Sequence, residues 1–381
     1  MINNLVEFVR NKYQTADFIP LHAPVFLGNE KKYVLETIES TFVSSVGAYV
    51  DKFENAIATF TGAERAIATV NGTAALHVAL KLVGVDIGDY VITQPLTFVA
   101  TCNAISYCGA IPVFVDVDVD TLGLSPQAVD EWLQEYAFIS DDGVCRLRAD
   151  HGAIKACVPM HTFGHPVRLD ELVAVCLRWN IAIVEDAAES LGSTYKARHT
   201  GVFGTVGVLS FNGNKIITTG GGGMILAGGD LGVKAKHMTT TAKRPHPYNY
   251  VHDEIGYNYR LPNLNAALGC AQLERLDDFV SFKRTLALEY QSLFSGTDYQ
   301  FVVEPEHCRS NYWLNAVICE SGSARESLLE STNNAGVMTR PIWALMCDLP
   351  MYSKCIRSDL KNARWLEERV VNLPSSFFEE R

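Results

Sequence analysis

The stretches Ile181-Ala182-Ile183-Val184-Glu185-Asp186 and Ser210-Phe211-Asn212-Gly213-Asn214-Lys215 decide the fold of this chain, because each brings reactive side chains to the end of a short apolar run. A short apolar run bounded by polar residues predicts a buried strand. In an open α/β sheet, ligands bind beyond the carboxyl ends of the strands. We therefore expect Asp186 and Lys215 to lie at one ligand site.

Helical and strand periods alternate through the first half of the chain. Helices are expected over residues 50–61, 73–83, 97–107, 125–135 and 169–179, and strands over residues 65–70, 90–94, 111–115, 153–159 and 181–184. Two more short strands are expected over residues 206–211 and 223–226, around a glycine-rich turn. This alternation predicts an α/β fold in which helices cover both faces of a mainly parallel sheet.

The rhythm changes in the second half of the chain. A polar and aromatic stretch over residues 239–259 is expected to form a loop or an interface segment. It is followed by an expected long helix from residue 263 to beyond 290, a strand over 312–319, and helices over 324–335 and 360–371. We therefore predict two domains: residues 1–255 form the N-terminal segment and a large ligand-binding domain, and residues 256–381 form a smaller C-terminal α+β domain.

The composition describes a soluble globular protein. Hydrophobic residues make up 48% of the 381 residues, the mean hydropathy is +0.06 and the formal net charge is −11. This charge argues against a nucleic-acid-binding surface, which needs clustered Lys and Arg. The ten cysteines are scattered without a C-x-x-C pair, and no apolar run suits a signal peptide or a membrane span. We expect a cytoplasmic protein that buries apolar surface in a partner subunit.

The polar residues at the expected strand ends suit one cofactor, pyridoxal phosphate. The turn Gly72-Thr73-Ala74 opens a helix whose free N–H groups favour an anion, and the Ser210 hydroxyl is a second donor for a phosphate. Asp186 can hold the proton on the pyridine nitrogen, Glu189 can contact the ring hydroxyl, and Lys215 can form a Schiff base. Each residue alone has an ordinary explanation, such as a helix cap or a surface lysine. Only the set predicts the cofactor.

Five ordered motifs carry a resemblance to a known family. They are Asn71-Gly72-Thr73-Ala74-Ala75, Pro95-Leu96-Thr97-Phe98-Val99-Ala100-Thr101, Glu185-Asp186-Ala187-Ala188-Glu189, Ser210-Phe211-Asn212-Gly213-Asn214-Lys215 and Gly256-Tyr257-Asn258-Tyr259-Arg260. The chain resembles the DegT family of sugar-nucleotide aminotransferases from about Ile19 onward. The resemblance implies the fold-type I architecture, with a mainly parallel seven-stranded sheet. It also implies a homodimer, sometimes assembled further, with each active site at the subunit interface.

The resemblance also assigns roles to single residues. It implies that Phe98 stacks on the pyridine ring, that Lys215 forms the Schiff base, and that Asn258 reaches the cofactor phosphate of the neighbouring subunit. Many relatives have Gln where this chain has Glu189, which leaves the contact with the ring hydroxyl open, because two negative groups repel unless they share a proton. Relatives that deoxygenate sugars carry His in place of the lysine, so Lys215 indicates amination.

The substrate expectation rests on a narrower resemblance. The patterns at 21–24, 41–47 and 161–165 are similar to the branch that aminates UDP-linked 4-keto-6-deoxy-N-acetylhexosamines, on the way to bacillosamine- or legionaminic-type sugars. Transfer from glutamate to C4 is therefore expected. The alternatives are a 3-keto sugar, a dTDP- or GDP-linked sugar, and a non-catalytic regulator that binds the cofactor. A nicotinamide-dependent dehydrogenase is disfavoured, because Gly72 lacks the companions of a G-x-G-x-x-G turn.

Six residues are candidates for contacts with the substrates. His161 is expected in an active-site loop, and Trp343 is expected to line the nucleotide or sugar pocket. The others are candidates near the diphosphate or the donor carboxylate: Lys243, Tyr259, Arg260 and Arg340. No metal site is expected, because His161 and His165 lack a third ligand.

Overall fold

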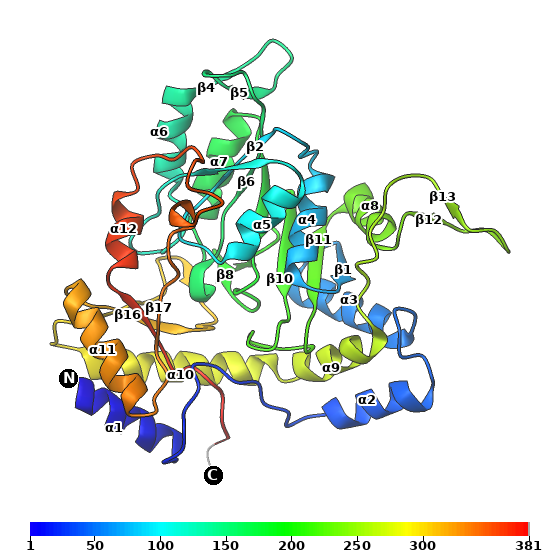
Figure 1. Ribbon diagram of the computed structural model, residues 1–381. Helices are drawn as coiled ribbons and strands as arrows, with labels where there is room; N and C mark the ends of the chain where they lie inside the picture. The colour runs from blue at the N-terminus through cyan, green and yellow to red at the C-terminus, as the bar shows by residue number, and fades with distance from the viewer. Residues whose placement is uncertain (380–381) are drawn as a thin grey trace.

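The computed structural model describes residues 1–379 and is organised around a central sheet of seven strands (Figure 1). In spatial order these are β1 (Arg65–Thr69), β11 (Gly223–Ala227), β10 (Val206–Ser210), β7 (Ala182–Asp186), β6 (Ile154–Val158), β2 (Tyr90–Thr93) and β3 (Ile111–Phe114). The strands from β10 to β3 pair in parallel, and β11 runs antiparallel to both of its neighbours. The predicted mainly parallel sheet is confirmed.

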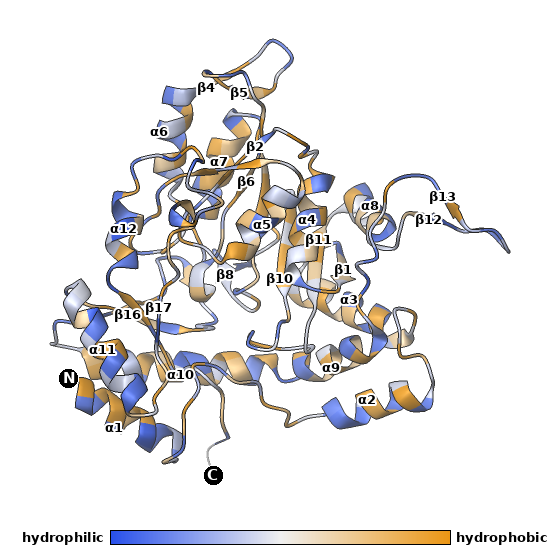
Figure 2. Cartoon of the chain, viewed as in Figure 1, coloured by the Kyte–Doolittle hydropathy of each residue, from blue (hydrophilic) through white to orange (hydrophobic). Residues whose placement is uncertain are grey.

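Helices cover both faces of this sheet, because successive strand residues point to opposite sides. Val91 packs on one face and its neighbour Ile92 on the other. The Val91 face carries α4 (Gly72–Leu82), α5 (Val99–Tyr107) and α8 (Gly229–Thr239). The opposite face carries α6 (Pro126–Tyr136), α7 (Leu169–Arg178), α3 (Ala48–Thr61) and α9 (Asn263–Leu273). Figure 2 shows the hydrophobic colour concentrated on the sheet between these helices.

A second, antiparallel sheet of four strands lies in the C-terminal part of the chain. Its order is β14 (Gln300–Phe301), β16 (Asn315–Ile318), β18 (Val370–Leu373) and β17 (Arg340–Pro341). The helices of this region and of the N-terminal segment are α1 (Ile2–Tyr13), α2 (Glu30–Glu39), α10 (Leu276–Phe294), α11 (Gly322–Asn334) and α12 (Lys361–Glu367). The division of the chain near residue 255 stays a prediction.

The remaining elements are short. Two hairpins are formed by β4 (Ala137–Ile139) with β5 (Cys145–Leu147) and by β12 (Lys243–Arg244) with β13 (Val251–His252). The β12–β13 hairpin projects from the body of the molecule (Figure 1). A three-stranded sheet contains β15 (Cys308–Arg309), β8 (Thr194–Tyr195) and β9 (Arg198–His199), and two 3-10 turns span Thr162–Gly164 and Met346–Asp348.

Two predicted helices differ from the structure. The helix expected from residue 263 to beyond 290 is two helices, because α9 ends at Leu273 and α10 begins at Leu276 after a turn in which the Arg275 N–H bonds to the Gln272 carbonyl. The helix expected over 360–371 ends at Glu367. The apolar residues after it form β18, because pairing with β16 and β17 satisfies their backbone groups.

Two observations bear on the expected cellular setting. Within residues 1–379, no helix is both long and apolar enough to cross a membrane. All ten cysteines have free thiols.

Candidate active site

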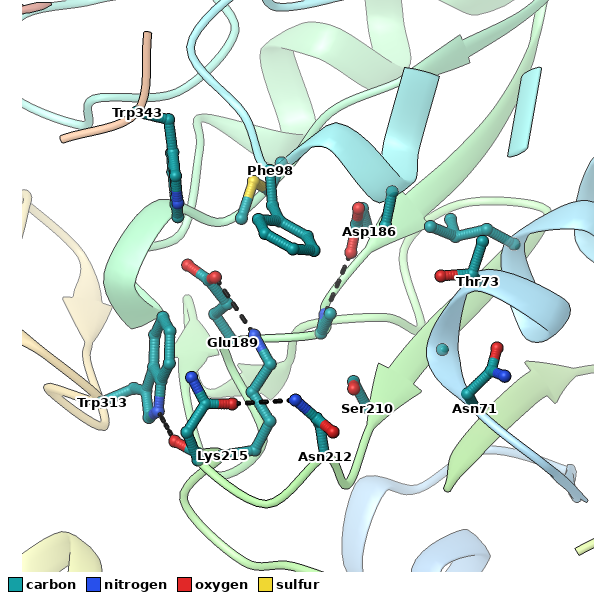
Figure 3. Close-up of a pocket in the computed structure, with 16 residues that line it drawn as sticks. Asn71, Thr73, Phe98, Asp186, Glu189, Ser210, Asn212, Lys215, Trp313 and Trp343 are labelled. Atoms are coloured by element: carbon teal, nitrogen blue, oxygen red, sulfur yellow. Dashed lines mark hydrogen bonds and ion pairs between the residues drawn. The ribbon is translucent and has the colours of Figure 1, made fainter. Parts of the chain in front are cut away.

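A cavity of about 330 Å³ lies beyond the carboxyl ends of β7 and β10 (Figure 3). Its walls include eight of the predicted site residues: Gly72, Thr73, Phe98, Asp186, Glu189, Ser210, Lys215 and Trp343. They come from five separate stretches of the chain. The structure therefore brings together the groups that the sequence places at strand ends.

Lys215 lies in the loop after β10, with a mostly buried side chain. Its Nζ donates to Glu189 Oε1 at 3.1 Å and lies 4.1 Å from the centre of the Trp313 ring. The other oxygen of Glu189, Oε2, accepts from the Phe163 N–H at 2.9 Å. Burial raises the pKa of the Glu189 carboxyl, and the nearby Lys215 charge opposes this shift. The amine and the carboxyl thus share one wall of the cavity.

Asp186 ends β7 and is buried. Its Oδ2 accepts from the Thr101 hydroxyl at 2.7 Å, and its Oδ1 accepts from the Ala188 N–H at 3.2 Å. Burial raises the pKa of this carboxyl. No ion pair joins Asp186 to a cation within residues 1–379, so a cationic ring N–H of a ligand would offset the desolvation of its charge.

The start of α4 forms the opposite end of the cavity (Figure 3). Asn71 caps the helix by accepting from the Ala74 N–H at 2.8 Å, so Ala74 is occupied and lies outside the cavity lining. Gly72 and Thr73, the first two residues of the helix, line the cavity together with Ser210. A Cβ on Gly72 would lie 3.0 Å from the Ser210 Cβ, so the glycine lets the helix start approach β10 closely. Two N–H groups, a hydroxyl and the helix dipole suit a phosphate.

These positions fit pyridoxal phosphate. The end of the cavity formed by the start of α4 and Ser210, here called the anion end, lies across the cavity from Lys215. Asp186 lies between the two (Figure 3). Pyridoxal phosphate carries a phosphate, a ring nitrogen and an aldehyde carbon, which are groups that an anion site, a carboxylate and an amine can bind. Phe98 is half exposed above this space, and its ring lies 6.5 Å from that of Trp343. The donor set therefore matches the cofactor at each end.

His161 does not line the cavity, although its loop contains Met160, which lines it, and Phe163, whose N–H bonds to Glu189. A contact of His161 with the substrate stays a prediction. The His161 ring is fully buried, with Nε2 3.2 Å from Glu185 Oε2 and Nδ1 accepting from the Val167 N–H. Glu185 is also buried and accepts three backbone N–H groups from the turn before β10. The pair thus serves to hold two loops beside the sheet.

Four of the other predicted substrate residues, and Asn258, also lie outside the lining of this chain's own cavity, whereas Trp343 lines it. Lys243, Arg340 and Asn258 are exposed. The ring of Tyr259 stacks on that of Tyr257, with 5.1 Å between the ring centres. Arg260 forms a β-bridge with Thr69 of β1, and its Nε is buried without a hydrogen-bond partner in the described chain.

Several residues on the cavity wall were not predicted. Asn212 and Asn214 line it, and a signal existed for them, because they belong to the same motif as Lys215. Met160 and Trp313 also line it. Trp313 is far from Lys215 in the sequence, and nothing in its local pattern indicates the contact.

Comparison with known proteins places the chain among aminotransferases. The model of the DegT/DnrJ/EryC1/StrS aminotransferase family matches residues 27–377. A putative pyridoxal phosphate-dependent aminotransferase, EpsN of Bacillus subtilis, is 36% identical, over 89% of this chain and 84% of its own. GDP-perosamine synthase of Escherichia coli O157:H7 is 36% identical, over 94% and 93%. The crystal structure of the aminotransferase TlmJ from Streptoalloteichus hindustanus superposes with a TM-score of 0.85 at 27% identity, covering 94% of this chain and 93% of that chain.

Proposed function

Because the chain belongs to the DegT/DnrJ/EryC1/StrS aminotransferase family, we propose that it transfers the amino group of glutamate to C4 of a nucleotide-linked 4-keto-6-deoxy sugar. The chain has the fold-type I architecture and is a pyridoxal-phosphate-dependent sugar aminotransferase. The observation that carries the proposal is the placement of the Lys215 amine beside Glu189, across the cavity from the anion end at Gly72 and Ser210.

Each wall of the cavity has a separate task in this reaction. Pyridoxal phosphate, when bound, supplies a ring that accepts the electron pair released as a substrate C–H bond breaks. The N–H groups of Gly72 and Thr73 and the Ser210 hydroxyl bind its phosphate. Asp186 keeps a proton on the ring nitrogen, and Phe98 covers one face of the ring.

Lys215 serves twice, because its Nζ binds the cofactor covalently and, once released, moves the proton at the reacting carbon. Glu189 keeps this amine in place through its 3.1 Å contact. Burial raises the pKa of Glu189, which favours a proton on this carboxyl. A protonated Glu189 donates a hydrogen bond to the ring hydroxyl oxygen where an ionised one would repel it. Glu189 is therefore compatible with the role that Gln has in many relatives.

The main proposal for the nucleotide is UDP on an N-acetylhexosamine, which rests on the resemblance at residues 21–24, 41–47 and 161–165. A GDP-linked sugar is the second candidate, since three relatives at 33–36% identity are GDP-perosamine synthases. Incubating the enzyme with glutamate and UDP-, GDP- or dTDP-linked 4-keto-6-deoxy sugars, and measuring 2-oxoglutarate, separates these candidates. Turnover of only a 3-keto sugar would refute amination at C4.

The functional unit in this proposal is a homodimer. Large apolar side chains are exposed on and after α2, among them Leu35, Ile38, Phe42 and Val46. A group of this kind is typical of a surface that a partner covers. Figure 2 shows hydrophobic colour on parts of α2, which lies at the edge of the molecule. The exposed Asn258 and the β12–β13 hairpin are free to reach the cavity of a second copy.

Mixing an inactive variant with an impaired one tests the shared site. Lys215→Ala lacks the amine, and Asn258→Ala is expected to lose about tenfold in activity through weaker cofactor binding, because it removes a hydrogen-bond donor to a charged group. If Asn258 serves the neighbouring subunit, each mixed dimer regains one intact site, so a randomly exchanged equal mixture should approach about a quarter of wild-type activity. A mixture no more active than the mean of its two parts would show that each site is built from one chain.

A further inference from the structure

The indole ring of Trp313 packs against the Lys215 amine. The Lys215 Nζ lies 4.1 Å from the centre of the indole ring, within the range of a cation–π contact. The indole Nε1 donates to the Asn214 carbonyl at 2.7 Å, which is the carbonyl just before Lys215 (Figure 3). One side chain therefore contacts both the reactive end of the lysine and the backbone from which the lysine extends.

The backbone around Trp313 is fixed on both sides. Tyr312 has a φ of 47°, in the left-handed region that non-glycine residues rarely adopt. The Tyr312 N–H bonds to the Ser310 hydroxyl at 3.0 Å, and the Trp313 N–H bonds to Asn311 Oδ1 at 2.8 Å. A strained conformation that is held by several bonds is often found at functional sites. These bonds set the direction in which the indole points.

Lys283 also restrains the backbone of Trp313, through a hydrogen bond to its carbonyl. It lies on α10 with a fully buried side chain, and its Nζ donates to the Trp313 carbonyl at 3.1 Å and to the Ser375 carbonyl. No carboxylate pairs with this amine within residues 1–379, and burial lowers the pKa of Lys283 well below its usual value. A buried lysine without a counter-ion is rare. Here its hydrogen bonds connect the C-terminal part of the chain to Trp313.

We propose that Trp313, anchored by Lys283, is the positioning residue for the Lys215 amine. The inference rests on the proposed function, because it takes Lys215 as the residue that bonds the cofactor. The indole ring contacts the amine through its face, and Glu189 contacts it through a hydrogen bond. The bond from Nε1 to the Asn214 carbonyl fixes the base of the lysine. The amine thus keeps one place both before it bonds the cofactor and after it is released.

The test follows formation of the bond between lysine and cofactor rather than turnover alone. The apoproteins of Trp313→Leu, Trp313→Phe and Lys283→Met are mixed with pyridoxal phosphate, and the visible absorbance band of the lysine-bound cofactor is followed. Total bound cofactor is measured by dialysis. Trp179→Leu is the matched control, since Trp179 is partly buried outside the cavity and its Nε1 also has an acceptor, Asp130.

Loss of the indole is expected to slow formation of the lysine-bound band roughly three- to tenfold in Trp313→Leu, the range of a partly desolvated cation–π contact. Phenylalanine retains an aromatic face and should recover part of this loss. Lys283→Met should also slow formation of the band. The double variant should form it no more slowly than Trp313→Leu, because both substitutions act through the Trp313 side chain. The total bound cofactor of each variant should remain within twofold of wild type. The rate of band formation in Trp179→Leu should also remain within twofold of wild type.

The proposal is overturned if Trp313→Leu forms the band within twofold of the wild-type rate. It is also overturned if Lys283→Met and Trp313→Leu have effects that multiply in the double variant. Should Lys283→Met fail to fold, the comparison of Trp313→Leu with Trp313→Phe still decides the role of the ring. Failure of the proposed function gives a different result, because Lys215→Ala would then keep the same absorbance band as the wild type.

Discussion

Replacing Asp186 with asparagine is expected to have opposite effects on the apoprotein and on the loaded enzyme. In the apoprotein, burial raises the pKa of Asp186, so the folded state holds a proton that the unfolded chain loses earlier as the pH rises. Stability is therefore lost as the pH rises from the ordinary Asp range through the raised pKa. Asparagine removes that loss at neutral pH, and its amide can bond to both Thr101 and the Ala188 N–H, the present partners of the carboxylate.

The loaded enzyme should respond in the other direction. Asparagine cannot stabilise a proton on the ring nitrogen, and breaking a buried charge pair costs about 3–5 kcal/mol. At about 1.4 kcal/mol for each factor of ten, kcat should fall roughly 10²- to 10⁴-fold. The apoprotein should be as stable as wild type or more stable by up to about 1 kcal/mol, which corresponds to a rise in Tm of about 1–2 °C for a chain of this size.

The assay pairs calorimetry of the apoprotein with the single-turnover rate of the glutamate half-reaction. Asp116→Asn is the matched control, because Asp116 is also buried but accepts from the N–H groups of Asn362 and Ala363 outside the cavity. Its half-reaction rate should remain within about twofold of wild type, whatever its stability. A half-reaction rate for Asp186→Asn within tenfold of wild type would refute the pairing of this carboxylate with the ring nitrogen.

Two further substitutions separate cofactor binding from packing. Gly72→Ala places a methyl group 3.0 Å from the Ser210 Cβ at the anion end. The cofactor Kd should therefore rise about tenfold, while kcat at saturating cofactor changes little. An unchanged Kd in a cofactor titration would contradict the phosphate site. His161→Ala leaves the buried Glu185 without its imidazole partner, so the free energy of unfolding should fall by about 1–3 kcal/mol, with the KM for the sugar unchanged. A selective rise in that KM would instead support the predicted contact of His161 with the substrate.

Much of the central fold follows from local patterns. The apolar runs of β7 and β10 and the helical periods between strands predict a parallel sheet, because both are short-range features. The placement of Asp186 and Lys215 on one cavity follows from the same rule, since parallel strands end at one edge. The first two residues of the strand Val370–Leu373 were predicted as the end of a helix, because the period of so short an apolar run does not distinguish the two structures.

The rest of the site depends on contacts that no local pattern contains. Trp313 reaches Lys215 because Asn311, Tyr312 and Lys283 fix its backbone, and these contacts join distant parts of the chain. Glycine and proline near His161 predict a loop, but they do not indicate whether the ring is buried. Its burial is determined by Glu185, whose charge requires partners once the sheet has formed.

The charge of the cavity is consistent with the proposed homodimer, in which two chains build each substrate site. Lys215 is the only cation among the described residues that line the cavity, and it is already occupied by Glu189. The proposed substrates bring a diphosphate and a carboxylate to a protein of net charge −11, and further cations close by would favour their binding. Lys243 projects from the body of its own chain on the β12–β13 hairpin. In the proposed homodimer, a second copy would supply this charge, and the choice among nucleotide sugars would then depend on residues that each subunit supplies to its neighbour.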